Sequence, residues 1–66
     1  MKITLNGKPH ELTGPMTVSE LLVELGFEGK PVVVELNREP VFARDHDKTR
    51  VEADASVEIV ALAAGG

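Results

Sequence analysis

The sequence predicts a single α+β domain in which one helix packs on a mixed sheet of about five strands. Three observations support this prediction. The chain has 66 residues, a length that suits one domain near the lower limit for folding alone. Short segments of alternating apolar and polar residues open and close the chain, and one segment of helical periodicity lies between them. The first and last strands can therefore pair in parallel at the centre of the sheet, with the helix in the connection.

The first two strands are predicted to form a hairpin. Met1 to Asn6 alternates between apolar and polar residues, as a half-buried strand does. Asn6-Gly7 follows, and this is a strong hairpin signal because both residues tolerate the positive φ of a type I′ turn. Lys8 to Leu12 returns as the second strand. Pro9 predicts an edge position for it, because proline cannot donate a hydrogen bond to a neighbouring strand.

The next segment carries the signals of a helix that begins and ends at defined residues. Thr17-Val18-Ser19-Glu20 is a capping box, in which the Thr17 hydroxyl caps the Glu20 amide and Glu20 reaches back. Gly26 is placed to end the helix as its C′ residue. The apolar residues between these signals fall at i, i+3, i+4 and i+7, which predicts one stripe facing the sheet: Val18, Leu21, Leu22 and Leu25.

The second half of the chain predicts two further strands and a loop. Val32 to Leu36 is the third strand, Asn37 to Glu39 is a turn, and Pro40 to Phe42 is a short fourth strand. Residues 43–50 are polar and lack periodicity, which indicates a surface loop with room for one helical turn.

The last strand completes the predicted fold. Val51 is expected in the core, Glu52 to Ser56 form a turn, and the final strand runs from Val57. The order β-β-α-β-β-β predicts a β-grasp, or ubiquitin-like, roll. Residues 1–66 are accordingly expected to form one domain that ends in a flexible Gly-Gly tail.

Composition excludes several classes of function. The chain has no cysteine, hence no disulfide, thiol nucleophile or cysteine-based zinc site. Its net charge of −4 disfavours nucleic acids and anionic membranes and suits a basic protein surface. Because no signal peptide or long apolar run is present, we expect a soluble, cytoplasmic protein. So small a core leaves no room for a buried catalytic cleft, so the chain is not expected to be an enzyme by itself.

Two histidine motifs invite a functional interpretation that the sequence does not favour. His10 shares the parity of Leu12, which predicts a structural side chain at the margin of the core. Asp45-His46-Asp47 contains metal-binding residue types, but adjacent loop residues rarely converge on one ion and no further ligand set is evident. We therefore expect no metal site and no cofactor bound by this chain.

The final strand predicts an apolar patch on the open face of the sheet. Val57 and Ile59 have one parity, whereas Glu58, Val60 and Leu62 have the other. If the first set packs on the helix, Val60 and Leu62 point outward. Val33 is expected on the same face, which would make the three residues a docking surface for a partner. The alternative is that they are scattered surface aliphatics.

The last four residues, Ala63-Ala64-Gly65-Gly66, predict the chemical group that the protein presents. Two glycines can thread a channel that is too narrow for side chains. The α-carboxylate of Gly66 is a poor electrophile, but it becomes reactive once it is activated as an acyl-adenylate, from which a sulfur nucleophile can displace AMP. Four extended residues reach only about 13 Å, so the domain must dock close to the active site of its partner.

These features together resemble the ThiS family, the small sulfur carrier proteins of thiamin biosynthesis. The resemblance covers nearly the whole chain and rests on the following segments: Asn6-Gly7, the helix start from Thr17 to Leu22, the strand from Val32 to Asn37, Val41, the strand from Val57 to Val60, and Gly65-Gly66. The chain departs from the family at two scaffold positions. Asp54-Ala55-Ser56 replaces a common Gly-Asp turn, and Phe42 stands where proline is frequent.

The resemblance implies a specific reaction sequence. A ThiF-like, E1-type adenylyltransferase would use ATP to adenylate Gly66, and a donor enzyme of the cysteine desulfurase type would supply sulfur for a thiocarboxylate. A ThiG-like thiazole synthase would take the sulfur. Two alternatives stay open: a carrier for molybdopterin, tungsten cofactor or cysteine synthesis, and a ubiquitin-like binding module whose tail carries no chemistry.

Overall fold

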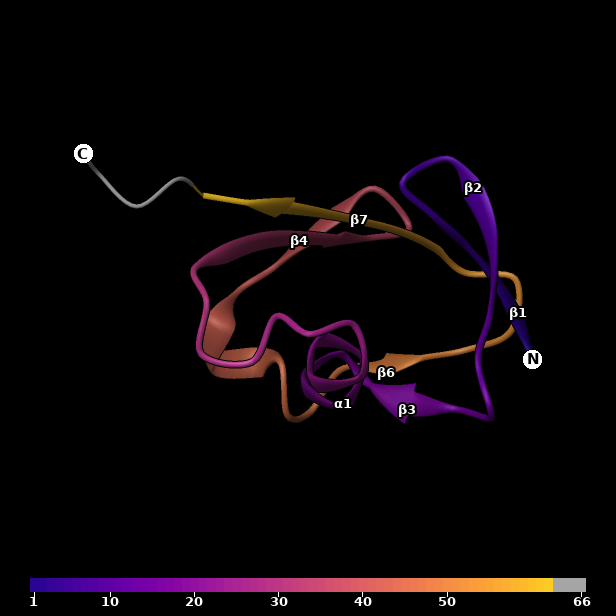
Figure 1. Cartoon of the computed structure of the whole chain (residues 1–66), viewed down its shortest axis with the longest axis horizontal. Helices are drawn as coiled ribbons and strands as arrows, with labels where there is room; N and C mark the ends of the chain where they lie inside the picture. Colours follow the sequence, from indigo (N-terminus) through magenta and orange to yellow (C-terminus); the bar gives the residue numbers. More distant parts are fainter. Residues whose placement is uncertain (63–66) are drawn as a thin grey trace.

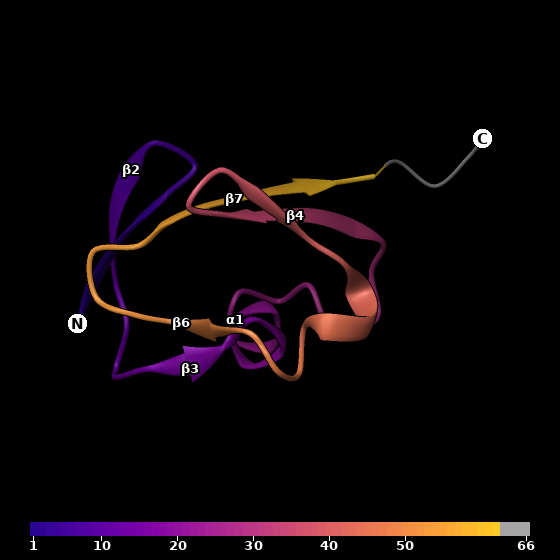
Figure 2. The same ribbon diagram turned by 180° about the vertical axis from the view of Figure 1, so that it is seen from behind.

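The computed structural model describes residues 1–62. Its main sheet has five strands in the order β2-β1-β7-β4-β5, and a second sheet pairs β3 with β6. Helix α1 and the small sheet lie on the same side of the main sheet (Figures 1 and 2). The elements are β1 (Lys2–Leu5), β2 (Lys8–Glu11), β3 (Met16–Thr17), α1 (Val18–Glu24), β4 (Val32–Leu36), β5 (Glu39–Val41), the 3₁₀ helix η1 (Ala43–Asp45), β6 (Arg50–Val51) and β7 (Ser56–Ala61).

Strand β7 occupies the centre of the main sheet. It pairs in parallel with β1, where Thr4 lies opposite Ser56 and Leu5 opposite Val57. On its other edge it pairs antiparallel with β4 over five residue pairs. The predicted parallel pairing of the first and last strands is confirmed, and with it the β-grasp arrangement.

Two asparagine side chains extend the hydrogen bonding of β7 where its neighbours turn away. Asn6 has φ 50° and Gly7 has φ 82°, as the predicted type I′ turn requires. The Asn6 side chain accepts from the backbone N–H of Ile59 at 2.9 Å and donates to its carbonyl at 3.3 Å. Asn37 similarly accepts from the N–H of Ser56 at 2.9 Å. Both turns therefore hold β7 in register.

Helix α1 begins at the predicted capping box. The Glu20 N–H donates to the Thr17 hydroxyl at 3.1 Å, and the Thr17 N–H donates to the Glu20 carboxylate at 2.8 Å. Gly26 follows the C-cap residue Leu25 with φ 85°, as predicted for C′. The helix has seven residues, and no helix within residues 1–62 is long and apolar enough to cross a membrane.

The core lies between the main sheet and α1. It takes alternate residues from the strands and the predicted stripe from the helix, of which Leu25 is only half-buried. The buried hydrophobic residues are Ile3, Leu12, Met16, Val18, Leu21, Leu22, Val34, Val51, Ala55, Val57 and Ile59. No polar or charged residue is buried among those described.

Strands β3 and β6 were not expected from the sequence. Met16 pairs with Val51 and Thr17 with Arg50 in an antiparallel bridge next to the start of α1. The Val18 N–H donates to the carbonyl of Thr49 at 2.8 Å, which ties the same two segments together. Two-residue strands show no alternation in the sequence, so they arise from the packing of distant segments.

The fourth strand and the following loop also differ in detail from the prediction. Strand β5 is Glu39–Val41 rather than Pro40–Phe42, because the turn has two residues, Asn37 and Arg38, with φ 51° and 70°. Phe42 is the N-cap of η1, which is the helical turn anticipated in the loop. The final strand begins at Ser56, one residue earlier than predicted, because Ser56 pairs with Thr4.

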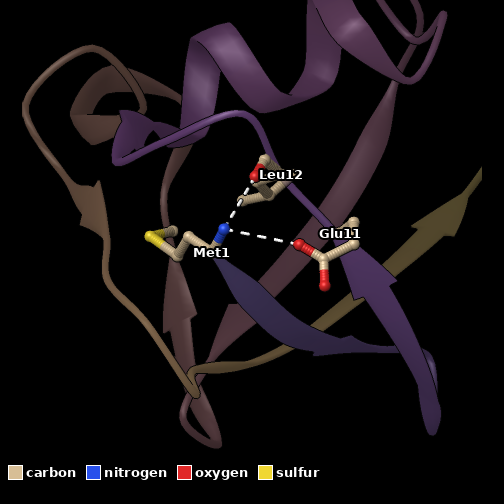
Figure 3. A network of polar contacts seen from close by, with 3 residues as sticks. All are labelled: Met1, Glu11 and Leu12. Carbon is tan, nitrogen blue, oxygen red and sulfur yellow. Dashed lines mark hydrogen bonds and ion pairs between the residues drawn. The ribbon is translucent and has the colours of Figure 1, made fainter.

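The N-terminus closes the hairpin of β1 and β2 at its open end (Figure 3). The Met1 amino group donates to the Leu12 carbonyl at 3.0 Å and lies 3.4 Å from the Glu11 carboxylate. The Leu12 N–H donates back to the Met1 carbonyl at 2.7 Å. These contacts hold Leu12 in the core at the end of β2.

The Asn6 contacts lead to a stability prediction. Asn6→Ala removes both hydrogen bonds to Ile59 and places alanine at positive φ, so urea unfolding should show a loss of about 1–3 kcal/mol. Asn6→Asp keeps an acceptor for the Ile59 N–H and tolerates this φ, so it should lose less than half as much. Equal stability of the alanine variant and the wild type would contradict the assigned role.

Candidate functional site

The alternation of β7 separates a core face from an open face. Val57 and Ile59 are 0% and 5% exposed, whereas Val60 and Leu62 are 59% and 50% exposed. Glu58 is also exposed. The predicted orientation of these five side chains is confirmed. Helix α1 packs on the core face, and within residues 1–62 no element of secondary structure covers the opposite one (Figure 1).

Strand β4 adds Val33 to the open face. Val33 lies directly opposite Val60 in the antiparallel register and is 47% exposed. The same register continues one step further, where the Leu62 N–H donates to the carbonyl of Pro31 at 3.0 Å. The expected shared face of Val33, Val60 and Leu62 is therefore present, although its role in binding stays a prediction.

Phe42 belongs to the same surface, and the sequence reasoning missed it. Val41 lies opposite Val34, so continuing the register by one residue places Phe42 level with Val33. Phe42 is extended and 57% exposed, and the Arg44 guanidinium lies 5.1 Å from the centre of its ring. One signal in the sequence could have found it: adjacent residues of a strand point to opposite faces, so Phe42 faces outward if Val41 faces the core. We call Val33, Phe42, Val60 and Leu62 the docking face; it holds four of the five exposed large hydrophobic residues in 1–62.

Next to the docking face, the sheet carries an acidic row. Glu35 and Glu58 lie directly opposite each other on β4 and β7, and Pro40 lies opposite Glu35 on β5. Glu58 is exposed and Glu35 is half-buried. The three ion pairs formed within residues 1–62 involve neither carboxylate. The open face is thus apolar toward the end of β7 and acidic one row away.

The remaining predicted site residues lie outside the described residues. These are Ala63, Ala64, Gly65 and Gly66, which follow Leu62 directly. Leu62 belongs to the docking face, so any partner that binds this face is in contact with the residue from which the predicted reactive segment continues. The chemistry expected at Gly66 stays a prediction.

The histidine motifs have separate local contacts. The His46 Nε2 lies 3.2 Å from the Val41 carbonyl, and the Asp47 carboxylate accepts from the Ser19 hydroxyl. His10 is half-buried and lies opposite Ile3 in the β1–β2 ladder. No group of three metal-ligating side chains comes together in the part of the chain that the structure describes.

An open groove lies on the helix side of the molecule. Its volume is about 530 Å³, and it runs between the end of α1, the loop before β4 and η1. Leu22, Val23, Phe27 and Pro31 give it an apolar lining, to which Lys30 adds a charge. Val23 is the fifth exposed large hydrophobic residue. The groove is open to solvent rather than enclosed.

Comparisons with known proteins agree with this architecture. A family model described as ThiS family matches residues 3–66. The sulfur carrier protein ThiS of Thermus thermophilus is 39% identical over 64 residues, which are 97% of this chain and 98% of that protein. The crystal structure of the thiamine biosynthesis protein ThiS from Geobacter metallireducens matches with a TM-score of 0.85 and 36% identity, over the full length of both chains.

Larger proteins also contain a related segment. The thiazole synthases of Paramagnetospirillum magneticum and Magnetococcus marinus are 38% and 36% identical to all 66 residues. The chain spans only 20% of the length of each of these relatives.

The exposure of β7 side chains predicts how substitutions affect folding. Val60→Glu and Leu62→Glu place a charge on an open surface, so each should lower the free energy of unfolding by no more than about 1 kcal/mol. Ile59→Glu, on the core face, buries an unpaired carboxylate and should leave the domain unfolded. Circular dichroism during thermal unfolding checks both; unfolding of the Val60 or Leu62 variants would show that this face is structural.

Proposed function

This chain belongs to the ThiS family, and from that membership we propose that it is a sulfur carrier of thiamin biosynthesis, loaded as a thiocarboxylate on Gly66. The observation that carries the proposal is the end-to-end match to a ThiS sulfur carrier, with 97% and 98% of the two chains aligned. The exposed docking face that leads to the terminal segment supports it.

The chemistry requires a free carboxylate on Gly66 and no side chain of this protein. A carboxylate oxygen attacks the α-phosphorus of ATP in the active site of a ThiF-like, E1-type adenylyltransferase, and pyrophosphate leaves. The resulting acyl-adenylate has a good leaving group, so the persulfide sulfur of a donor of the cysteine desulfurase type displaces AMP at the acyl carbon. A second thiol then cleaves the resulting acyl disulfide, which releases the thiocarboxylate on Gly66 and leaves a disulfide between the donor cysteine and that thiol. Because the partner enzymes bind ATP, supply the sulfur and catalyse these steps, this chain is a substrate and a carrier rather than an enzyme.

We propose a ThiG-like thiazole synthase as the acceptor of the sulfur. Support comes from the two thiazole synthases in which a segment similar to this whole chain occupies a fifth of the length. Joining a carrier-like segment to an enzyme in one polypeptide raises the effective concentration of each for the other. That arrangement is useful if the carrier hands its sulfur to the synthase.

The docking face accounts for how partners select this carrier. Gly66 is the fourth residue after Leu62, so a fully extended segment places it at most about 13 Å away. The partner must therefore bind the body of the domain beside its own active site. Val60 on β7 and Leu62, just after the end of β7, would make that contact together with Val33 and Phe42.

Loading of the carboxylate can be measured directly. After incubation with ATP, a ThiF-like enzyme from the same organism and a sulfur source, the intact mass should rise by the exchange of one oxygen for sulfur. Deleting Gly66 should abolish the change, because the shortened chain ends in a differently placed carboxylate. If the unaltered protein gains no mass with any E1-like enzyme of that organism, a binding module without carrier chemistry becomes the better interpretation.

The docking face leads to a second functional prediction. Val60→Glu and Leu62→Glu should each abolish adenylation in a pyrophosphate-release assay, because docking would bury an unpaired charge. Val23→Glu serves as the matched control, since Val23 is equally exposed but lies on α1. Wild-type rates in the folded Val60 and Leu62 variants would refute the docking face.

A further inference from the structure

We propose that Glu35 and Glu58 together form the receptor for one arginine on the surface of the partner, beside the apolar docking face. This inference rests on the proposed function and deepens it, because it specifies the chemistry of the partner surface. The occupant is a protein surface whose apolar side chains cover the docking face and whose arginine reaches the two carboxylates.

In the free domain, the carboxylates of Glu35 and Glu58 lie close enough to repel each other. Glu35 and Glu58 are directly opposed on adjacent antiparallel strands, where side chains stand about 5 Å apart at Cβ. Like charges in this position destabilise a sheet. No cation within residues 1–62 forms an ion pair with either carboxylate. No ion pair in the described fold therefore offsets the repulsion, which a bound cation would reverse.

Because the docking face adjoins Glu35 and Glu58, binding of a partner there changes the hydration of the two carboxylates. Val33 precedes Glu35 by two residues on the same face of β4, and Val60 follows Glu58 by two on β7. Side chains two residues apart along a strand stand about 7 Å apart, so a surface that covers Val33 and Val60 and extends by one row also removes water from the carboxylates. Two dehydrated carboxylates without a counterion would oppose binding strongly. The partner must therefore supply the positive charge.

The geometry favours arginine over lysine. A guanidinium has five N–H donors in one plane, so it can bond two carboxylates on neighbouring strands at once. A guanidinium is also less strongly hydrated than an ammonium group. This suits a position with apolar neighbours, which here are the docking face on one side and Pro40, opposite Glu35 on β5, on another. The overall charge of −4 further favours approach to a basic surface.

The test uses the double variant Glu35→Gln/Glu58→Gln, with the ThiF-like adenylyltransferase of the same organism as the probe. Calorimetric titration should show an affinity about tenfold to a hundredfold weaker than that of the wild type, because charge-assisted bonds are lost. The affinity should also depend less steeply on salt. The melting temperature of the free domain should rise by about 2–5 °C as the repulsion disappears. Glu28→Gln, exposed on the loop after α1, should match the wild type in all three.

The outcomes separate this inference from the proposed function. If the wild type binds and is adenylated, Val60→Glu abolishes binding, and the glutamine variant binds like the wild type, the arginine receptor is refuted while the carrier function stands. If the glutamine variant is less stable than the wild type, the pair is not repulsive and the inference also fails. Absence of any binding or loading by the wild type refutes the proposed function and this inference together.

Discussion

The position of β7 between two hydrogen-bonded neighbours is the constraint on which the rest of the structure depends. A strand held on both edges has one register, and its alternation then assigns each side chain to the core or to the open face. A slip by one residue would bury Glu58 and expose Ile59, at a cost that so small a core could not offset. The side chains of Asn6 and Asn37 add hydrogen bonds to β7 at both places where a neighbour turns away. The strand that leads toward the proposed reactive end is thus fixed by the whole fold.

The same constraint explains why one face of the sheet stays open. Within residues 1–62 the fold has one α-helix, of seven residues, and its apolar stripe is used on the core face. The opposite face carries Val33, Phe42, Val60 and Leu62 without cover from any described element. Contiguous exposed apolar surface of this kind is typical of interaction sites. Under the proposed function, the surplus of acidic residues favours a basic partner for this face.

Local signals made most of the fold predictable, and features that depend on tertiary contacts were missed. Asn6-Gly7, the capping box at Thr17 and Glu20, and the parity of β7 each act within a few residues, so the sequence alone contains them. The bridge between Met16 and Val51 joins segments far apart in the chain and leaves no periodic pattern. The opposition of Glu35 and Glu58 likewise requires the register between strands, which alternation within one strand cannot provide.

The open face and the short segment after it impose a joint requirement on any partner. A long tail would let a reactive carboxylate search for its active site while the body of the domain made weak or variable contacts. With Gly66 as the proposed reactive residue, the four residues from Ala63 to Gly66 do not allow this, because their total reach is comparable to the width of two or three strands, about 13 Å against about 4.8 Å per strand. An error of one strand spacing in docking would use up more than a third of that reach. The four apolar side chains of the docking face do not fix the position of a partner to within one strand, since aliphatic contacts are non-directional. A directional charge pair one row away would define it, and this is the physical reason for assigning Glu35 and Glu58 to recognition rather than to stability.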